Sequence, residues 1–142
     1  MQIQISGRRL PPSDGRQPKK LVILLHGYGG SGDGMISFAL SLAPLLPDTL
    51  FISPNAPTPR PNDFGYQWFP MTNLDAEVLR QGRAKANALY DSWREGCTQA
   101  APIVRALIDS ELKNNCIAPE NLAIIGMSQG AMLATHVALP NL

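Results

Sequence analysis

Short apolar runs mark the predicted strands of this chain. Residues 20–25 form a run that charged residues precede and glycines follow, as expected of a central parallel strand covered on both faces. Shorter runs predict strands at residues 50–52 and 122–125. Residues 2–6 alternate apolar and polar side chains, which predicts an edge strand, and the polar, proline-containing residues 7–19 predict a loop after it.

Two segments between these runs have the sequence pattern or composition of helices. In residues 35–46 the apolar side chains recur three or four positions apart, which predicts an amphipathic helix. Residues 75–114 are helical in composition, and we expect interruptions near Gly82, Gly96 and Pro102. The alternation of strands and helices predicts a single α/β domain over residues 1–142, with a mostly parallel sheet flanked by helices.

A long irregular segment separates the predicted strand at residues 50–52 from the helical region. Residues 53–70 contain five prolines, so regular structure is not expected there, and long loops inside compact domains are more often functional than idle. Its aromatic side chains either anchor the loop to the body or contact a ligand, and both roles are compatible. They are Phe64, Tyr66, Trp68 and Phe69.

Composition removes several classes of function. With 142 residues, 44% of them hydrophobic, the chain has the apolar content for one ordinary core. The net charge of +1 predicts no nucleic-acid surface, and no apolar stretch is long enough for a secretory signal or a membrane span, so we expect a cytoplasmic protein. Cys97 and Cys116 are interpreted as ordinary reduced thiols, and the scattered histidines and cysteines make no metal site. No cofactor is expected.

The most informative motif is Gly126-Met127-Ser128-Gln129-Gly130. It stands between a predicted strand and a run of helix-forming residues. In a strand, sharp turn and helix of this kind the glycines permit a strained turn that exposes the serine hydroxyl, the nucleophile elbow of serine hydrolases. The alternative is that Ser128 only caps the following helix. The motif therefore makes Ser128 the candidate nucleophile.

The glycine-rich residues 26–34 follow the central strand and form the candidate oxyanion loop. Acyl transfer places a negative charge on the former carbonyl oxygen, which two backbone N–H groups usually stabilise. We expect these donors to be the N–H groups of Tyr28 and Gln129.

Phosphate binding is the competing interpretation of residues 26–34. The spacing of their glycines fits a dinucleotide-binding pattern. However, no acidic residue follows the strand at residues 50–52, and a Gly-Lys-Ser/Thr sequence is missing as well. The pattern therefore favours the oxyanion loop.

Neither histidine is expected to be the general base. His136 follows Ser128 by eight residues on one helix, which places it about 12 Å along the axis and out of hydrogen-bonding reach. His26 lies in the candidate oxyanion loop, where a structural hydrogen-bonding role is favoured over catalysis. The aspartates precede the nucleophile, whereas the acid and base follow it in this architecture.

Four sequence blocks in this order resemble the phospholipase/carboxylesterase family of α/β-hydrolases, which includes acyl-protein thioesterases. The resemblance runs from about Lys20 to the last residue. It implies that Ser128 is the nucleophile, that Tyr28 and Gln129 supply oxyanion N–H groups, and that Trp68 lines the acyl site. The blocks are residues 24–29 (LLHGYG), 54–57 (PNAP), 65–69 (GYQWF) and 125–131 (IGMSQGA).

The chain departs from this family at three points. Many relatives have leucine in place of Tyr28 and an acidic residue in place of Pro70. Family members also continue for several strands that carry the catalytic Asp and His, whereas this sequence stops fourteen residues after Ser128. We therefore expect a fragment or truncated product, with the strand at residues 122–125 at a sheet edge through which copies of the chain could associate.

Two hypotheses follow from the sequence. The first is a serine hydrolase of carboxylic esters or thioesters that acts on small-molecule substrates through an acyl-serine intermediate and is inactive as the isolated fragment. The second is a catalytically dead module that binds an acyl ligand or pairs its exposed strand with another chain.

Overall fold

The computed structural model describes residues 5–60, 64–72 and 75–139. A four-stranded sheet forms its centre, in the order β1-β3-β2-β6. β2 (Lys20–Leu25) is parallel to β3 (Thr49–Pro54) on one side and to β6 (Leu122–Gly126) on the other, and β1 (Gly7–Leu10) is antiparallel to β3. The mostly parallel sheet of the sequence prediction is confirmed.

The first strand differs from the prediction. β1 begins at Gly7, inside the predicted loop, and Ile5 and Ser6 lie outside any strand, while residues 2–4 of the predicted strand fall outside the described residues. β1 pairs with β3 alone, with Leu10 opposite Phe51. Because an edge strand needs only one partner and buries little surface, main-chain pairing and not an apolar pattern sets its position.

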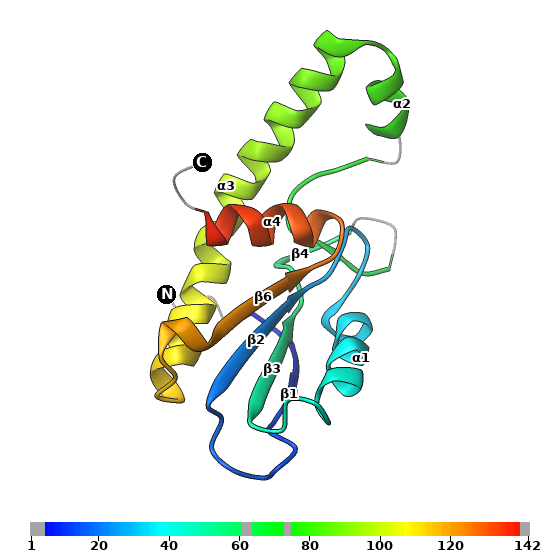
Figure 1. Cartoon of the computed structure of the whole chain (residues 1–142). Coiled ribbons are helices and arrows are strands. Elements are labelled where there is room, and N and C mark those ends of the chain that lie inside the picture. Colours follow the sequence, from blue (N-terminus) through cyan, green and yellow to red (C-terminus); the bar gives the residue numbers. More distant parts are fainter. Residues whose placement is uncertain (1–4, 61–63, 73–74, 140–142) are drawn as a thin grey trace.

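α1 (Gly32–Leu42) packs on one face of the sheet, and α3 and α4 pack on the other (Figure 1). α1 covers a core that includes Val22, Leu24 and Phe51. The helix begins three residues before the prediction because the Ser31 hydroxyl caps it by accepting a hydrogen bond from the Gly34 N–H. It also ends earlier, at Leu42.

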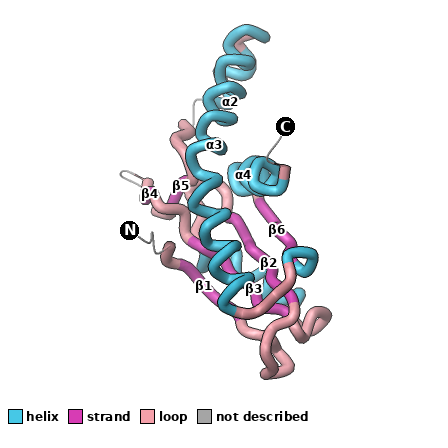
Figure 2. The backbone as a smooth tube through the Cα atoms, turned by 90° about the vertical axis from the view of Figure 1, so that its left-hand side faces the viewer, coloured by secondary structure: helices cyan, strands magenta, loops and turns pink. Residues whose placement is uncertain are grey.

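The predicted helical region forms α2 (Asp75–Arg80) and α3 (Arg83–Asn114). The interruption near Gly82 is confirmed, and Gly82 itself has a φ of 110°. The interruptions near Gly96 and Pro102 are wrong, because α3 continues through both (Figure 2). Gly96 is the point where the Phe69 ring approaches α3, and burial of the residues around Pro102 offsets the hydrogen bond that its missing N–H costs.

The remaining elements lead to the candidate nucleophile. A single 3₁₀ turn, η1 (Pro119–Asn121), turns the chain into β6, and α4 (Gln129–Ala138) follows. In the predicted irregular segment, β3 extends as far as Pro54, and the other strands among its described residues are the two-residue β4 (Thr58–Pro59) and β5 (Tyr66–Gln67). Within the described sheet β6 pairs only with β2 and lies at an edge.

Candidate active site

Ser128 occupies a strained turn between β6 and α4. Its φ of 51° and ψ of −116° place a non-glycine residue where L-amino acids rarely go. The side chain is exposed and makes no capping hydrogen bond to α4 among the described residues, so the simple helix-cap alternative has no support. The local geometry is that of an elbow that presents its hydroxyl to solvent.

The two flanking glycines are required by close backbone contacts. A Cβ at Gly126 would lie 2.2 Å from the Gly130 carbonyl oxygen, and a Cβ at Gly130 would lie 2.2 Å from the Leu25 carbonyl oxygen. Both distances are too short for non-bonded atoms. The glycines therefore let α4 fold back tightly onto the ends of β6 and β2.

The candidate oxyanion loop lies directly beside this elbow. A Cβ at Gly27 would lie 3.4 Å from the Cβ of Ser128, and the Met127 N–H donates a 3.0 Å hydrogen bond to the Leu25 carbonyl. Within the loop, the Gly30 N–H donates to the Gly27 carbonyl at 2.9 Å, which closes a tight turn. The parallel pairing of β2 and β6 thus brings together two segments a hundred residues apart.

The N–H groups of Tyr28 and of Gln129, the first residue of α4, have no protein acceptor among the described residues, and the same holds for those of Gly27 and Ser128. The neighbouring Gly29 and Gly30 N–H groups donate within the protein. The positive end of the α4 dipole adds to the Gln129 N–H. The geometry leaves the Tyr28 and Gln129 N–H groups available to a negatively charged oxygen.

His26 is part of the scaffold of the loop. Its buried ring accepts a 2.9 Å hydrogen bond from the Ala56 N–H at Nε2, and its Nδ1 lies 2.7 Å from the Gly27 carbonyl oxygen, to which it donates. Burial lowers the pKa of His26, so the neutral ring is favoured. With both ring nitrogens engaged, His26 has the structural role that the sequence favoured.

The aromatic segment after the proline-rich loop is fastened to the same place. Trp68 is buried, stacks on the His26 ring at 5.2 Å between centroids, and donates from Nε1 to the His26 carbonyl at 2.9 Å. Phe69 is buried against α3, whereas the Phe64 side chain is 93% exposed. The anchoring role expected for these aromatics is therefore observed for Trp68 and Phe69. Contact of Trp68 with an acyl chain stays a prediction.

The sequence predicted the N–H group of Gln129 as a donor but not the role of its side chain, and it did not predict a role for Asn55. The buried side chain of Gln129 bonds to the main chain of Trp68 and Phe69, and the Asn55 side chain accepts a 2.7 Å hydrogen bond from the Gly32 N–H. Asn55 stands in the block PNAP (residues 54–57), which was the only sequence signal for it. Nothing local signals the partners of Gln129, which lie about sixty residues away.

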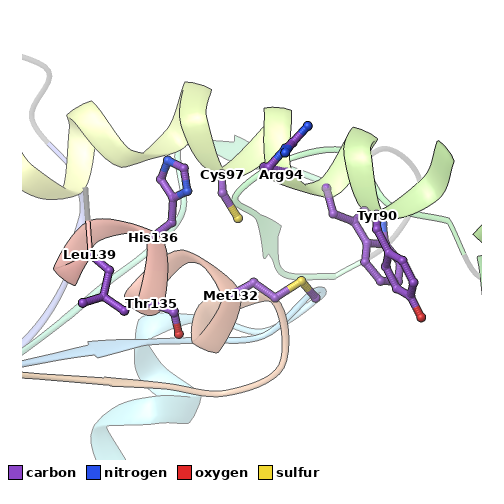
Figure 3. Close-up of a pocket in the computed structure, with 8 residues that line it drawn as sticks. Tyr90, Arg94, Cys97, Met132, Thr135, His136 and Leu139 are labelled. Atoms are coloured by element: carbon purple, nitrogen blue, oxygen red, sulfur yellow. The ribbon is translucent and has the colours of Figure 1, made fainter. Parts of the chain in front are cut away.

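A cavity of about 260 Å³ lies between α3 and α4 (Figure 3). Met132, one helical turn after Ser128, is part of its wall, and His136 stands farther along α4 with Nε2 3.5 Å from the Thr98 hydroxyl. Burial raises the pKa of the Cys97 thiol, which favours its neutral form. The lining is Tyr90, Trp93, Arg94, Cys97, Met132, Thr135, His136 and Leu139.

Among the residues that the structure describes, no three His, Cys, Asp or Glu side chains are arranged to hold a metal ion. In the described part of the chain no helix combines the length and the apolar character that crossing a membrane requires.

A mostly parallel sheet with helices on both faces and a serine at the strand-to-helix turn defines the α/β-hydrolase class. Residues 12–141 match the family model described as Phospholipase/Carboxylesterase, and the chain belongs to this family of hydrolases. The family resemblance of the sequence is thereby confirmed, and the match begins eight residues before Lys20.

Two curated proteins are similar to most of the chain. An acyl-protein thioesterase 1 from Kluyveromyces lactis is 33% identical over 124 residues, covering 82% of this chain and 49% of that protein. An uncharacterised hydrolase from Mycosarcoma maydis is 29% identical over 138 residues, covering 96% and 48%. The chain spans about half the length of these curated relatives.

Solved structures show the same fold. The esterase PE8 is 33% identical and superposes with a TM-score of 0.80 over 96% of this chain and 58% of its own. A carboxylesterase from Mesorhizobium loti is 17% identical, with a TM-score of 0.65 over 94% and 54% of the two chains. The second likeness supports the fold alone.

Proposed function

We propose that this chain carries the nucleophile and oxyanion hole of a serine hydrolase that cleaves carboxylic esters or thioesters through an acyl-serine intermediate. The observation that carries the proposal is the exposed Ser128 at its strained turn, next to Gly27 of the candidate oxyanion loop. In this role the Ser128 hydroxyl attacks the acyl carbonyl, and the N–H groups of Tyr28 and Gln129 stabilise the resulting oxyanion. Small-molecule esters or thioesters are the proposed substrates.

Activation of Ser128 needs a general base. His26 is engaged at both ring nitrogens, and His136 stands eight residues along α4, so neither histidine serves. We propose that the base and its acidic partner come from outside these 142 residues and that the isolated chain is inactive in turnover. The cytoplasmic location expected from the sequence stays a prediction.

A fluorophosphonate probe tests this function. In a protein that carries this chain together with the segment that supplies the base and its acidic partner, we expect the probe to label Ser128, and we expect Ser128→Ala to abolish the labelling. Ser37→Ala is the matched control, because Ser37 is an exposed serine of α1 whose hydroxyl bonds only to the Gly34 carbonyl among the described residues. Labelling that survives in Ser128→Ala, or a folded sample that is never labelled, would contradict the proposal.

A second candidate function is a strand-pairing module without catalysis. The observation that favours it is β6, whose outer edge has no partner strand in the described sheet and whose Ile125 side chain is 38% exposed. In this role β6 pairs with another copy of the chain or another extended segment. Light scattering across a concentration series distinguishes a monomer from a self-associated chain. A monomer at all concentrations would exclude pairing of β6 between copies of the chain.

A further inference from the structure

We propose that the Gln129 side chain is a positioning residue that couples the two donors of the oxyanion hole. This inference rests on the proposed function. The Gln129 amide is fully buried. Its Oε1 accepts a 2.9 Å hydrogen bond from the Trp68 N–H, and its Nε2 donates a 2.8 Å hydrogen bond to the Phe69 carbonyl. The side chain thus bonds to one main-chain donor and one main-chain acceptor in the short segment formed by residues 65–69.

The segment that Gln129 holds is in turn bonded to the oxyanion loop. The Gly29 N–H donates to the Tyr66 carbonyl and the Tyr66 N–H donates to the Gly30 carbonyl, both at 2.9 Å. The Trp68 indole donates to the His26 carbonyl, also at 2.9 Å. The loop is therefore bonded to this segment on both sides of Tyr28.

The backbones of the two segments are in direct contact. A Cβ at Gly65 would lie 2.1 Å from the Gly29 carbonyl oxygen, so the loop cannot shift toward the segment. Movement of the segment would therefore move the Tyr28 N–H. The other donor, the N–H of Gln129, belongs to the residue whose side chain fixes the segment. One residue thus sets the spacing of both donors, on which the stabilisation of the oxyanion depends.

We call the two hydrogen bonds of the Gln129 side chain the clamp. It requires one acceptor and one donor on the same side chain. Methionine has a similar length and leaves the Trp68 N–H and the Phe69 carbonyl without partners in a buried place. An ionised glutamate accepts from Trp68 but cannot donate to Phe69, whereas a protonated glutamate does both. Substitution by glutamate is therefore expected to make the clamp depend on pH.

Amide hydrogen exchange measured by NMR tests the clamp without reference to catalysis. In Gln129→Met we expect the Gly29 and Tyr66 amides to exchange at least ~10-fold faster, while the Val22 amide of the central strand keeps its protection. Gln99→Met is the matched control, because Gln99 is exposed on α3 and bonds only to Glu95 among the described residues. Unchanged exchange at Gly29 and Tyr66 would overturn the proposal.

Gln129→Glu gives a second, reversible test that holds even where Gln129→Met does not fold. Burial next to a carbonyl oxygen raises the pKa of the new carboxyl group. After correction for intrinsic exchange, the Gly29 and Tyr66 amides should regain their protection as the pH falls and lose it as the pH rises. Protection that is independent of pH in this variant and normal at neutral pH would contradict the clamp.

Kinetics separate this inference from the proposed function. The kinetic test uses a protein that carries this chain together with the segment that supplies the base and its acidic partner. With an aryl ester as the probe, Gln129→Met should there lower kcat at least ~10-fold and change KM less than about threefold, because the donors act on the transition state more than on the bound ester. A fall in binding alone would overturn a positioning role. If the unmodified protein that carries this chain together with the base and its acidic partner does not hydrolyse the ester, the proposed function fails, and hydrogen exchange still decides whether Gln129 holds the loop.

Discussion

Arg9 and Glu111, 102 positions apart, form a two-pronged ion pair that ties β1 to α3. The Arg9 Nη1 lies 2.6 Å from Oε1 of Glu111, and its Nη2 lies 2.8 Å from Oε2. Glu111 is only 8% exposed, and its carboxylate is compensated by Arg9 and by a 3.2 Å hydrogen bond from the Asn115 side chain to Oε2. The pair fixes the edge strand whose own sequence predicts no strand.

Removal of this arginine should be costly. Arg9→Met leaves a mostly buried carboxylate with less compensation and should lower the free energy of unfolding by about 2 kcal/mol. Arg94→Met is the control, since the Arg94 and Asp91 pair is exposed and should contribute no more than about 0.5 kcal/mol. Urea denaturation measures both, and equal effects would contradict the special role of Arg9.

Two helical glycines should respond to alanine in opposite directions. Gly130→Ala forces a methyl group against the Leu25 carbonyl and should cost about 3 kcal/mol or more. Gly34→Ala adds a methyl group near only the Ser31 hydroxyl, at 3.8 Å, and should stabilise the protein by about 0.5–1 kcal/mol. Thermal or urea unfolding shows the sign of each change, and a tolerated Gly130→Ala would argue against the tight turn.

Gly96 and Phe69 should be energetically coupled. A Cβ at Gly96 would lie 2.5 Å from Cγ of Phe69, so Gly96→Ala should cost about 1–3 kcal/mol despite the better helix propensity of alanine. A smaller side chain in Phe69→Leu should remove part of that cost. A double-mutant cycle measures the coupling, and strictly additive effects would show that the ring does not limit this position.

The strained backbone at Ser128 should lower the stability of the folded protein. Ser128→Gly relieves a backbone strain of about 1–3 kcal/mol but adds freedom to the unfolded chain, for a net gain of about 1 kcal/mol. Ser128→Ala keeps the strain and should change stability by less than about 0.5 kcal/mol. Both variants should lose fluorophosphonate labelling. If glycine is no more stable than alanine here, the turn is not strained.

The burial of His26 should make stability depend on pH. Its folded pKa lies below the unfolded value of about 6.5, so below that pH the unfolded chain takes up a proton that the folded chain resists. The free energy of unfolding should therefore reach its highest value, as far as His26 determines it, above about pH 6.5. It should fall as the pH drops below that value, by at most about 1.4 kcal/mol per pH unit. His26→Asn should remove this slope and His136→Asn should keep it. A slope that survives in His26→Asn points to another group.

The sequence predicted those elements whose physical constraint is local. β2 matches its predicted residues 20–25 because burial on both faces demands an unbroken apolar run. β1 left no such pattern, since one pairing partner and the Arg9–Glu111 ion pair hold it. The course of α3 through Gly96 and Pro102 depends on packing against segments far along the chain, which local propensity does not register.

The same division holds at the candidate site. Ser128 and the candidate oxyanion loop could be found because glycines record the backbone constraints of a turn in the adjacent residues. The clamp by Gln129 could not be found, because its partners are two main-chain groups whose approach the tertiary fold determines. Trp68 was expected as an acyl contact and is seen as an anchor of the loop, a role that requires the position of the His26 carbonyl.

The register that places Leu24 opposite Ile125 has a kinetic consequence. Loop closure over about a hundred residues is entropically expensive, so this pairing is expected to form late, after the local helices. The Ser128 hydroxyl would then acquire its surroundings only at the last stage of folding. Partly folded chains would present an unpaired edge of β2 to solvent. The competition between pairing with β6 and aggregation would then determine the yield of folded protein.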